Sequence, residues 1–443
     1  MINRNNKKGF TIVELVIVIA VIAILAAVLI PTFAGIIRKA NISADTQLVK
    51  NMNTALAADE AINGKPEDFN GVIAIVREAG YVLSCFNPTT EGCYVAWEKE
   101  TNQLLLIDGK DNFKVIYSAK EGYGDPDDSW YFSVSSKEAK DTLIEKYPTG
   151  VNVQYTISEA KNLAGVLASG EDTISISLDE SLVVENDDTI LINNENAKVT
   201  LDLGDSTVSS TTLDSVPFEI TKGTLNVNGG VITSLGKFVD SDGKTQTVAF
   251  CGYAGGILNV EDTKISSAAA MPLYYRGAPG SVKNATIEAD NAALAVRTAE
   301  VLVKDCTVTA AKNRALWITA SQGTGYVGNA VVTIDGGTYT APTAVITLFD
   351  PINTDNANDK YGATAKILGG SFKATTEGGS IFDFYNQPGG KFEISDGTFN
   401  NTAFAKLDTA AKWAALCGGV PAGYTVKVDG VGTSTVTLTL VKN

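Results

Sequence analysis

The sequence predicts an α+β protein in which a long N-terminal helix precedes a small head and a larger β domain. An unbroken apolar run extends from Phe10 to Ile30, and helical spacing of apolar residues continues beyond it. A short strand-and-turn phrase then recurs through the last two thirds of the chain. We expect four parts, with boundaries at 1–9 (a leader), 10–61 (a stem helix), 62–150 (a small α+β head) and 151–443 (a β domain).

The apolar run is long enough to cross a membrane as one helix. A bilayer core is about 30 Å thick and a helix rises about 1.5 Å per residue, so residues 10–30 span it with little to spare. The run contains one ionisable side chain, Glu14, and an ionised group inside a span usually marks function. A secretory signal peptide has a shorter apolar core. A plain signal anchor would give no reason for Glu14, and a buried soluble helix does not suit this length.

The order of residues at this end resembles the N-terminus of type IV prepilins and of the pseudopilins of type II secretion. A basic leader is followed by Gly9, Phe10, Glu14, the apolar run and Pro31. The resemblance covers about residues 1–60. It implies that a membrane-embedded prepilin peptidase cuts between Gly9 and Phe10 and methylates the new amine. It also implies a single-pass membrane protein that joins other pilin subunits in a cell-surface filament, with its head outside the cell.

Glu14 has a physical reason to favour assembly. The amine of a processed Phe10 would lie four residues, about 6 Å, from Glu14 along the helix. Leaving either charge unpaired in hydrocarbon is costly. A neighbouring subunit's amine can neutralise Glu14 when helices pack side by side, which would favour one axial register. Pro31 lacks a backbone donor and predicts a bend near the membrane surface.

The head is expected to hold a short helix and a small antiparallel sheet. Apolar spacing predicts a helix at 69–79, and β-rich runs follow it. Cys85 and Cys93 flank a turn-rich loop and either form a disulfide or remain thiols; no pair of cysteines has the C-x-x-C spacing of zinc or redox sites. The acidic loop 122–128 offers calcium ligands, but a solvated turn explains it better. We therefore expect no cofactor.

The repeated phrase in the β domain predicts a right-handed parallel β-helix. It reads LNVNGGVIT at 225–233 and VTIDGGTYT at 332–340, and its shortest spacings match one coil of such a stack. Gly and Asn at the turns supply left-handed backbone conformations. Helices near 157–167 and 408–416 would cap the ends, and paired strands at 424–428 and 435–441 would finish the C-terminal edge. A β-sandwich with irregular hairpins is the alternative fold.

One outward face of the β-helix is a candidate for binding an acidic polysaccharide. Arginines one coil apart can meet carboxylates, and aromatic rings can meet sugar faces. An ordinary solvent face with partly packed aromatics is the competing interpretation. Aligning the coils at Leu273, Leu294, Leu316, Val345 and Ile381 places five side chains outward: Tyr274, Arg276, Arg297, Trp317 and Phe382.

Composition narrows the function further. The formal charge of −15 argues against nucleic acid and anionic lipid as partners, and the absence of histidine excludes Ser-His-Asp catalysis and histidine metal sites. Parallel β-helices such as those of pectate lyases often act on polysaccharides. Asp350, Asp355 and Asp383 lie near the candidate face, but their spacing selects no catalytic pair. We expect a non-enzymatic, pilin-like subunit whose head binds a surface or glycan; the alternative is a membrane-anchored polysaccharide lyase or glycoside hydrolase.

Overall fold

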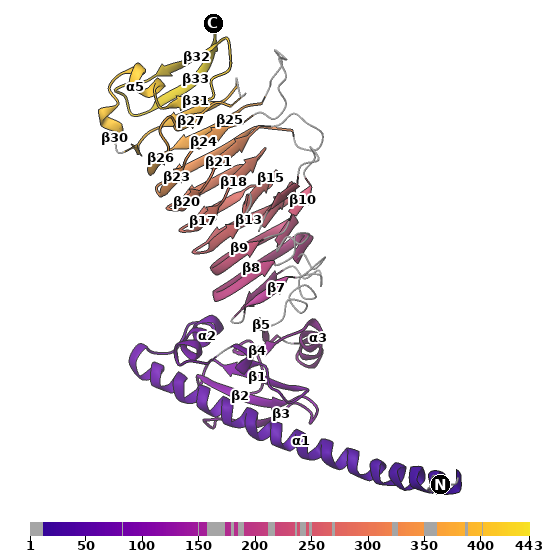
Figure 1. Cartoon of the computed structure of the whole chain (residues 1–443). Coiled ribbons are helices and arrows are strands. Elements are labelled where there is room, and N and C mark those ends of the chain that lie inside the picture. The colour runs from indigo at the N-terminus through magenta and orange to yellow at the C-terminus, as the bar shows by residue number, and fades with distance from the viewer. Residues whose placement is uncertain are drawn as a thin grey trace, which may run out of the picture. The chain divides into compact units, whose positions relative to one another are not determined.

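The chain folds into two compact units, shown in the computed structural model of Figure 1. The first holds most of residues 12–133 together with 147–152, and the second holds 134–146 and 153–443. The fold class is α+β, as predicted. The structure describes residues 12–81, 83–148, 150–156, 173–178, 181–184, 190–210, 218–234, 237–239, 245–247, 250–267, 271–320, 327–349, 361–385, 389–400 and 402–443.

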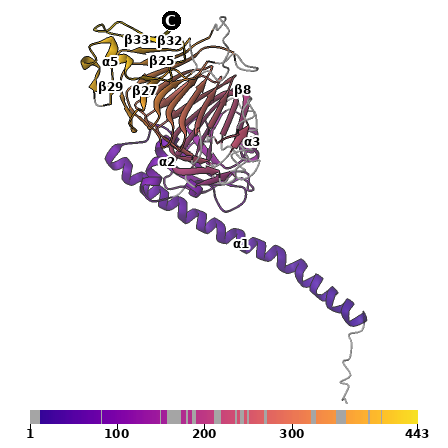
Figure 2. The same cartoon turned by 45° about the horizontal axis from the view of Figure 1, so that its top comes forward.

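The first unit is built on one long helix, α1 (Ile12–Asn63), which Figure 2 shows as an uninterrupted coil. Pro31 lies inside the helix and does not end it. The helix continues through an alanine-rich segment that has high helical propensity. It ends at Asn63, where Gly64 takes a left-handed conformation with φ of 87°.

A short helix and a four-stranded antiparallel sheet complete the first unit. The helix α2 (Phe69–Glu78) is capped by Asp68, whose carboxylate accepts the Gly71 N–H at 2.9 Å. The sheet has the order β4–β1–β2–β3. The elements not yet located are η1 (Leu83–Phe86), β1 (Cys93–Glu98), β2 (Gln103–Asp108), β3 (Lys114–Tyr117) and β4 (Trp130–Val134).

The second unit is a parallel β-helix with three faces. The first face contains β12 (Phe250–Tyr253), β15 (Leu273–Arg276), β18 (Ala292–Arg297), β21 (Arg314–Thr319), β24 (Ala344–Leu348), β27 (Ser380–Asp383) and β31 (Cys417–Gly418). The second contains β5 (Asn152–Thr156), β6 (Thr173–Ser177), β13 (Gly256–Glu261), β16 (Gly280–Lys283), β19 (Glu300–Lys304), β22 (Ala330–Asp335), β25 (Ala363–Ile367) and β28 (Lys391–Ile394). The third contains β7 (Leu182–Val184), β14 (Lys264–Ser267), β17 (Thr286–Ala289), β20 (Thr307–Ala310), β23 (Thr338–Ala341), β26 (Ser371–Ala374) and β29 (Thr398–Phe399). Two long strands, β8 (Ile190–Ser210) and β9 (Phe218–Ser234), run through all three faces.

The turn residues and the core explain why these coils stack in register. Between the second and third faces, Asp262, Asn284 and Asp305 all have φ near +50°, a conformation that Asn and Asp tolerate. Inside the stack, alternate side chains meet their counterparts on the next coil, as in the stacked rings of Tyr339 and Phe372 at 4.9 Å. The parallel β-helix that the repeat predicted is therefore confirmed.

The C-terminal end of the stack is covered by the elements that the sequence predicted there. The helix α5 (Ala410–Ala414) is capped by Thr409, and β32 (Tyr424–Asp429) pairs with β33 (Val436–Lys442) as an antiparallel hairpin. β33 lies antiparallel on β28. The cap predicted at 157–167 lies outside the described residues. The remaining elements are α3 (Lys137–Lys146), β10 (Lys237–Val239), β11 (Thr245–Thr247), β30 (Thr402–Ala403) and η2 (Phe404–Lys406).

Candidate functional site

The first half of α1 presents apolar side chains to its surroundings on every side. Between Ile12 and Ile37, each described side chain is exposed except Ala26, which is half-buried; Ile12 is 81% exposed and Ile30 67%. A continuous apolar surface of this kind marks a membrane or protein contact. α1 is long and apolar enough to cross a membrane and is unique in this among the described helices.

Two of the predicted processing and assembly residues fall on this exposed half. Glu14 lies in the first turn of α1 and is exposed, and Pro31 lies farther along the same segment. Gly9 and Phe10 lie outside the described residues. The structure thus places the carboxylate near the N-terminal end of an exposed apolar helix.

The second half of α1 is fixed to the sheet and to the segment before β1 by polar groups. Asp45 is only 3% exposed, and its two carboxylate oxygens accept hydrogen bonds from the backbone N–H and the hydroxyl of both Thr89 and Thr90, at 2.6–3.0 Å. Closer to the exposed half, Arg38 forms an ion pair with Asp108 at 2.6 Å. Fully satisfied buried polar groups fix one arrangement of the elements they join.

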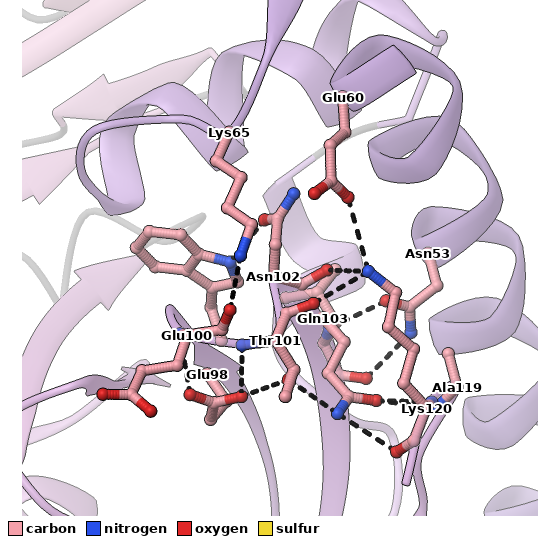
Figure 3. A network of polar contacts seen from close by, with 12 residues as sticks. Asn53, Glu60, Lys65, Glu98, Glu100, Thr101, Asn102, Gln103, Ala119 and Lys120 are labelled. Carbon is pink, nitrogen blue, oxygen red and sulfur yellow. Dashed lines mark hydrogen bonds and ion pairs between the residues drawn. The ribbon is translucent and has the colours of Figure 1, made fainter. Parts of the chain in front are cut away.

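Asn53 continues this attachment by pairing with the backbone of β2. Its carboxamide accepts the N–H of Leu104 at 2.8 Å and donates to the carbonyl of the same residue at 2.8 Å. β3 pairs with β2 only from Leu106 onward, so Asn53 takes the position that a neighbouring strand would occupy. Figure 3 shows this contact beside Gln103 and Lys120, which connect β2 to the segment after β3.

Cys85 and Cys93 are thiols, so the disulfide weighed for this pair is not formed. The Cys85 thiol donates to the sulfur of Met52 on α1 at 3.1 Å. Cys93 begins β1, and burial raises the pKa of its thiol to about 11. Each sulfur is therefore directed into its own buried surroundings.

The first face of the β-helix brings together four of the five predicted glycan-contact residues. Arg276 and Arg297 are in direct register on adjacent strands, and Tyr274 and Trp317 belong to the adjacent outward ladder. Arg276 also lies over the ring of Tyr253, 5.9 Å from its centroid. The two guanidinium side chains are only 6–7% exposed, and Trp317 is half-buried.

Phe382 lies in β27 on the first face, but its side chain points into the core and not outward. In the structure Leu316 pairs with Ile346, and Ile346 pairs with Phe382. The alignment of coils made from the sequence had placed Val345 and Ile381 at these positions. A shift of one residue exchanges the two sides of a strand. Phe382 is consequently fully buried in the core, and its neighbour Asp383 occupies the outward position.

The corrected register reveals an aromatic row that the sequence alignment missed. Trp317 and Phe349 meet edge-to-face with centroids 4.8 Å apart, and Phe349 stacks on Tyr385 at 5.2 Å. Arg314 lies over Tyr385 and 4.0 Å from the carboxylate of Asp383. Counting the inward positions from Ile346 rather than Val345 would have placed Phe349 on the outward side.

Two carboxyl groups of this face have raised pKa values, but they lie far apart. Burial raises the pKa of Glu219 and of Asp383 above the ordinary range. The ladder runs from Glu219 through Cys251, Tyr274, Ala295, Trp317 and Thr347 to Asp383. Six steps of about 4.8 Å separate them by about 29 Å, beyond the spacing of a glycosidase pair. Asp350 and Asp355 lie outside the described residues.

Comparison with known proteins finds a family that matches the segment containing the apolar half of α1. Residues 4–30 match the family described as the prokaryotic N-terminal methylation motif. The chain is similar to the type IV wide pilus major component PilA4 of Thermus thermophilus, with 51% identity over 55 residues, 12% of this chain and 40% of that protein. It is also similar to a fimbrial protein of Moraxella nonliquefaciens, with 35% identity over 81 residues, 17% of this chain and 53% of that protein. The chain thus spans about half or less of the curated relatives it matches, and no solved structure matches it. The predicted resemblance to prepilins is confirmed for the N-terminal segment.

Proposed function

We propose that this protein is a pilin-like subunit of a filament of the type IV pilus or type II secretion kind. The subunit begins as a single-pass membrane protein and enters the filament through α1. The observation that carries the proposal is the division of α1 into an exposed apolar half and a half fixed to the rest of the first unit by Asp45 and Asn53. A helix of this kind can be inserted in a membrane or packed against sister helices without disturbing the head.

Processing at Gly9–Phe10 is part of the same proposal. The match of residues 4–30 to the methylation motif supports this step. The step is also needed for the role of Glu14, because the amine of Phe10 exists only after a prepilin peptidase has released it. The partners are this peptidase and methyltransferase, and then other pilin subunits. The β-helix would be displayed outside the cell, and its size suits a minor or tip subunit better than a densely packed shaft.

Binding of an acidic polysaccharide is the proposed task of the displayed β-helix. The specific observation in its favour is the register of Arg276 with Arg297 beside Tyr274 and Trp317. Two guanidinium groups on adjacent strands, whose backbones are about 4.8 Å apart, favour a ligand with repeated carboxylates.

The proposal is tested by mass spectrometry of the mature N-terminus from the native host. The expected result is a chain that begins at an N-methylated Phe10. A chain that retains Met1, or one cut elsewhere, would contradict the processing step and with it the pilin role.

A separate measurement tests the glycan task. Full-length protein in detergent should bind oligogalacturonate, and the double substitution Arg276→Gln with Arg297→Gln should remove that binding. Lys312→Gln is a control, because Lys312 forms an exposed ion pair with Asp290 elsewhere on the stack. Chain cleavage in the same mixture would favour the carbohydrate-active enzyme, the alternative function.

A further inference from the structure

A groove lined by amide, hydroxyl and charged residues together with two valines crosses the second face of the β-helix, away from the arginine pair. It encloses about 380 Å³ and crosses four consecutive strands, β8, β9, β13 and β16. Strands about 4.8 Å apart give it a length of about 14 Å. The side chains and backbone that line it belong to Thr200, Asn226, Val227, Asn228, Asn259, Val260, Glu261, Ser281 and Lys283.

Three of the lining side chains are linked into a row along the groove. Asn259 donates to the carboxamide oxygen of Asn226 at 2.9 Å, and Ser281 donates to the carboxamide oxygen of Asn259 at 2.9 Å. These bonds leave Asn259 with a second N–H and a further acceptor site. Because these hydrogen bonds already hold the three side chains in place, ordering them would cost a ligand little binding free energy.

The chemistry of the groove selects a neutral ligand rich in hydroxyl groups. Amide and hydroxyl side chains offer donors and acceptors in nearly equal numbers. Glu261 and Lys283 are in register on adjacent strands, so their opposite charges offset one another. A polyanion would meet a single lysine here, in contrast to the two arginines of the first face. Among the described residues that line the groove, none has an aromatic ring or a long apolar side chain that would favour an apolar peptide or lipid.

We propose that this groove binds a neutral saccharide chain running across the coils. Its length fits about three sugar rings, with the row Asn226–Asn259–Ser281 bonding to hydroxyl groups on successive rings. The site is independent of the acidic-polysaccharide site and of the filament role, so either can fail without affecting it.

The test is calorimetric titration of the full-length protein in detergent with cellohexaose, xylohexaose and chitohexaose. We expect at least one of these neutral chains to bind. Asn259→Leu breaks the row and fills the groove, and it should weaken binding at least about tenfold. Asn228→Ala removes an exposed lining amide without touching the row, and it should weaken binding by a smaller factor.

The matched control is Asn313→Leu. Asn313 donates to Asn291 at 2.8 Å, so this variant breaks the same kind of amide–amide bond outside the groove and should bind like the unaltered protein. If Asn259→Leu fails to fold by circular dichroism, Asn228→Ala decides the outcome. The proposal is overturned if none of the three chains binds, if the groove variants bind as well as the control, or if only oligogalacturonate binds.

Discussion

The two halves of α1 share one helix but meet opposite surroundings. From Ile12 to Ile37 nearly all side chains are apolar and exposed, whereas from Arg38 onward charged and amide groups, together with buried apolar side chains, attach the helix to the rest of the first unit. The apolar half can exchange one apolar environment for another, because non-directional contacts do not specify a partner. The polar half cannot, because each of its bonds requires one particular acceptor or donor. Specific attachment in this molecule therefore comes from polar groups.

Glu14 is the exception within the exposed half, and its removal should have the largest effect. We expect Glu14→Ala to leave membrane insertion intact and to abolish incorporation into filaments, because the carboxylate would no longer meet a neighbour's amine. Immunoblotting of membrane and sheared-filament fractions measures both. Val13→Ala is the control and should assemble normally. Normal amounts of the Glu14 variant in filaments would contradict the role given to this residue.

Asp45→Ala should cause the largest loss of stability in the attached half. It removes the acceptor of four hydrogen bonds and leaves the N–H and hydroxyl of the buried Thr90 without that acceptor, at an expected cost of about 4 kcal/mol. Urea unfolding of the full-length protein in detergent, followed by tryptophan fluorescence, measures it. Asp59→Ala removes a carboxylate that accepts a hydrogen bond from Asn63 on the same helix, and it should cost far less. Equal losses for the two variants would show that Asp45 does not hold the head.

A pair of leucine and isoleucine truncations compares the two halves directly. Leu56 is fully buried against the sheet, so Leu56→Ala should cost about 3 kcal/mol through lost contacts and a cavity. Ile17 is 57% exposed, and Ile17→Ala should change the stability of the detergent-solubilised protein by less than about 0.5 kcal/mol. The same unfolding experiment reports both. A large loss for Ile17→Ala would indicate that the first half packs on the head.

Asn53→Ala is expected to have an intermediate effect of about 2 kcal/mol, because it leaves the N–H and carbonyl of Leu104 without their partner. Hydrogen exchange should show faster exchange at the Leu104 amide in particular. Asn51→Ala is the matched control, since the Asn51 side chain bonds to Gln47 on the same helix. An unchanged Leu104 exchange rate would refute the strand-like role of Asn53.

Much of this architecture could be predicted because it depends on residues that are close together in the sequence. The uniform apolar run predicted α1, and the turn residues at 229, 262, 284 and 305 predicted the coils, since each needs a backbone conformation that few residues adopt. The cap at Asp408–Leu416 and the final hairpin were predicted from the same kinds of signal, and the helix is shorter than expected.

The remaining features depend on partners distant in sequence. The apolar spacing gave no sign that Asp45 and Asn53 would hold the helix to the rest of the first unit, because their partners lie 44–51 residues away. Strand β4 and helix α3 were not predicted at all. On the first face, coil lengths vary, and a one-residue error in alignment moved Phe382 outward and hid Phe349. Periodicity identifies the face of a strand only when the register is known.

The reversed strand β33 has a consequence for how copies of this protein can join. A stack of parallel strands invites another strand at its open end, which is a route to uncontrolled fibres. Here β33 occupies that end in the opposite direction, and the outer strand β32 carries Lys427 and Asp429 in an ion pair at 2.8 Å. With growth from this terminus discouraged, the filament formation that we propose would be left to the stem, where the proposed cut between Gly9 and Phe10 would control it.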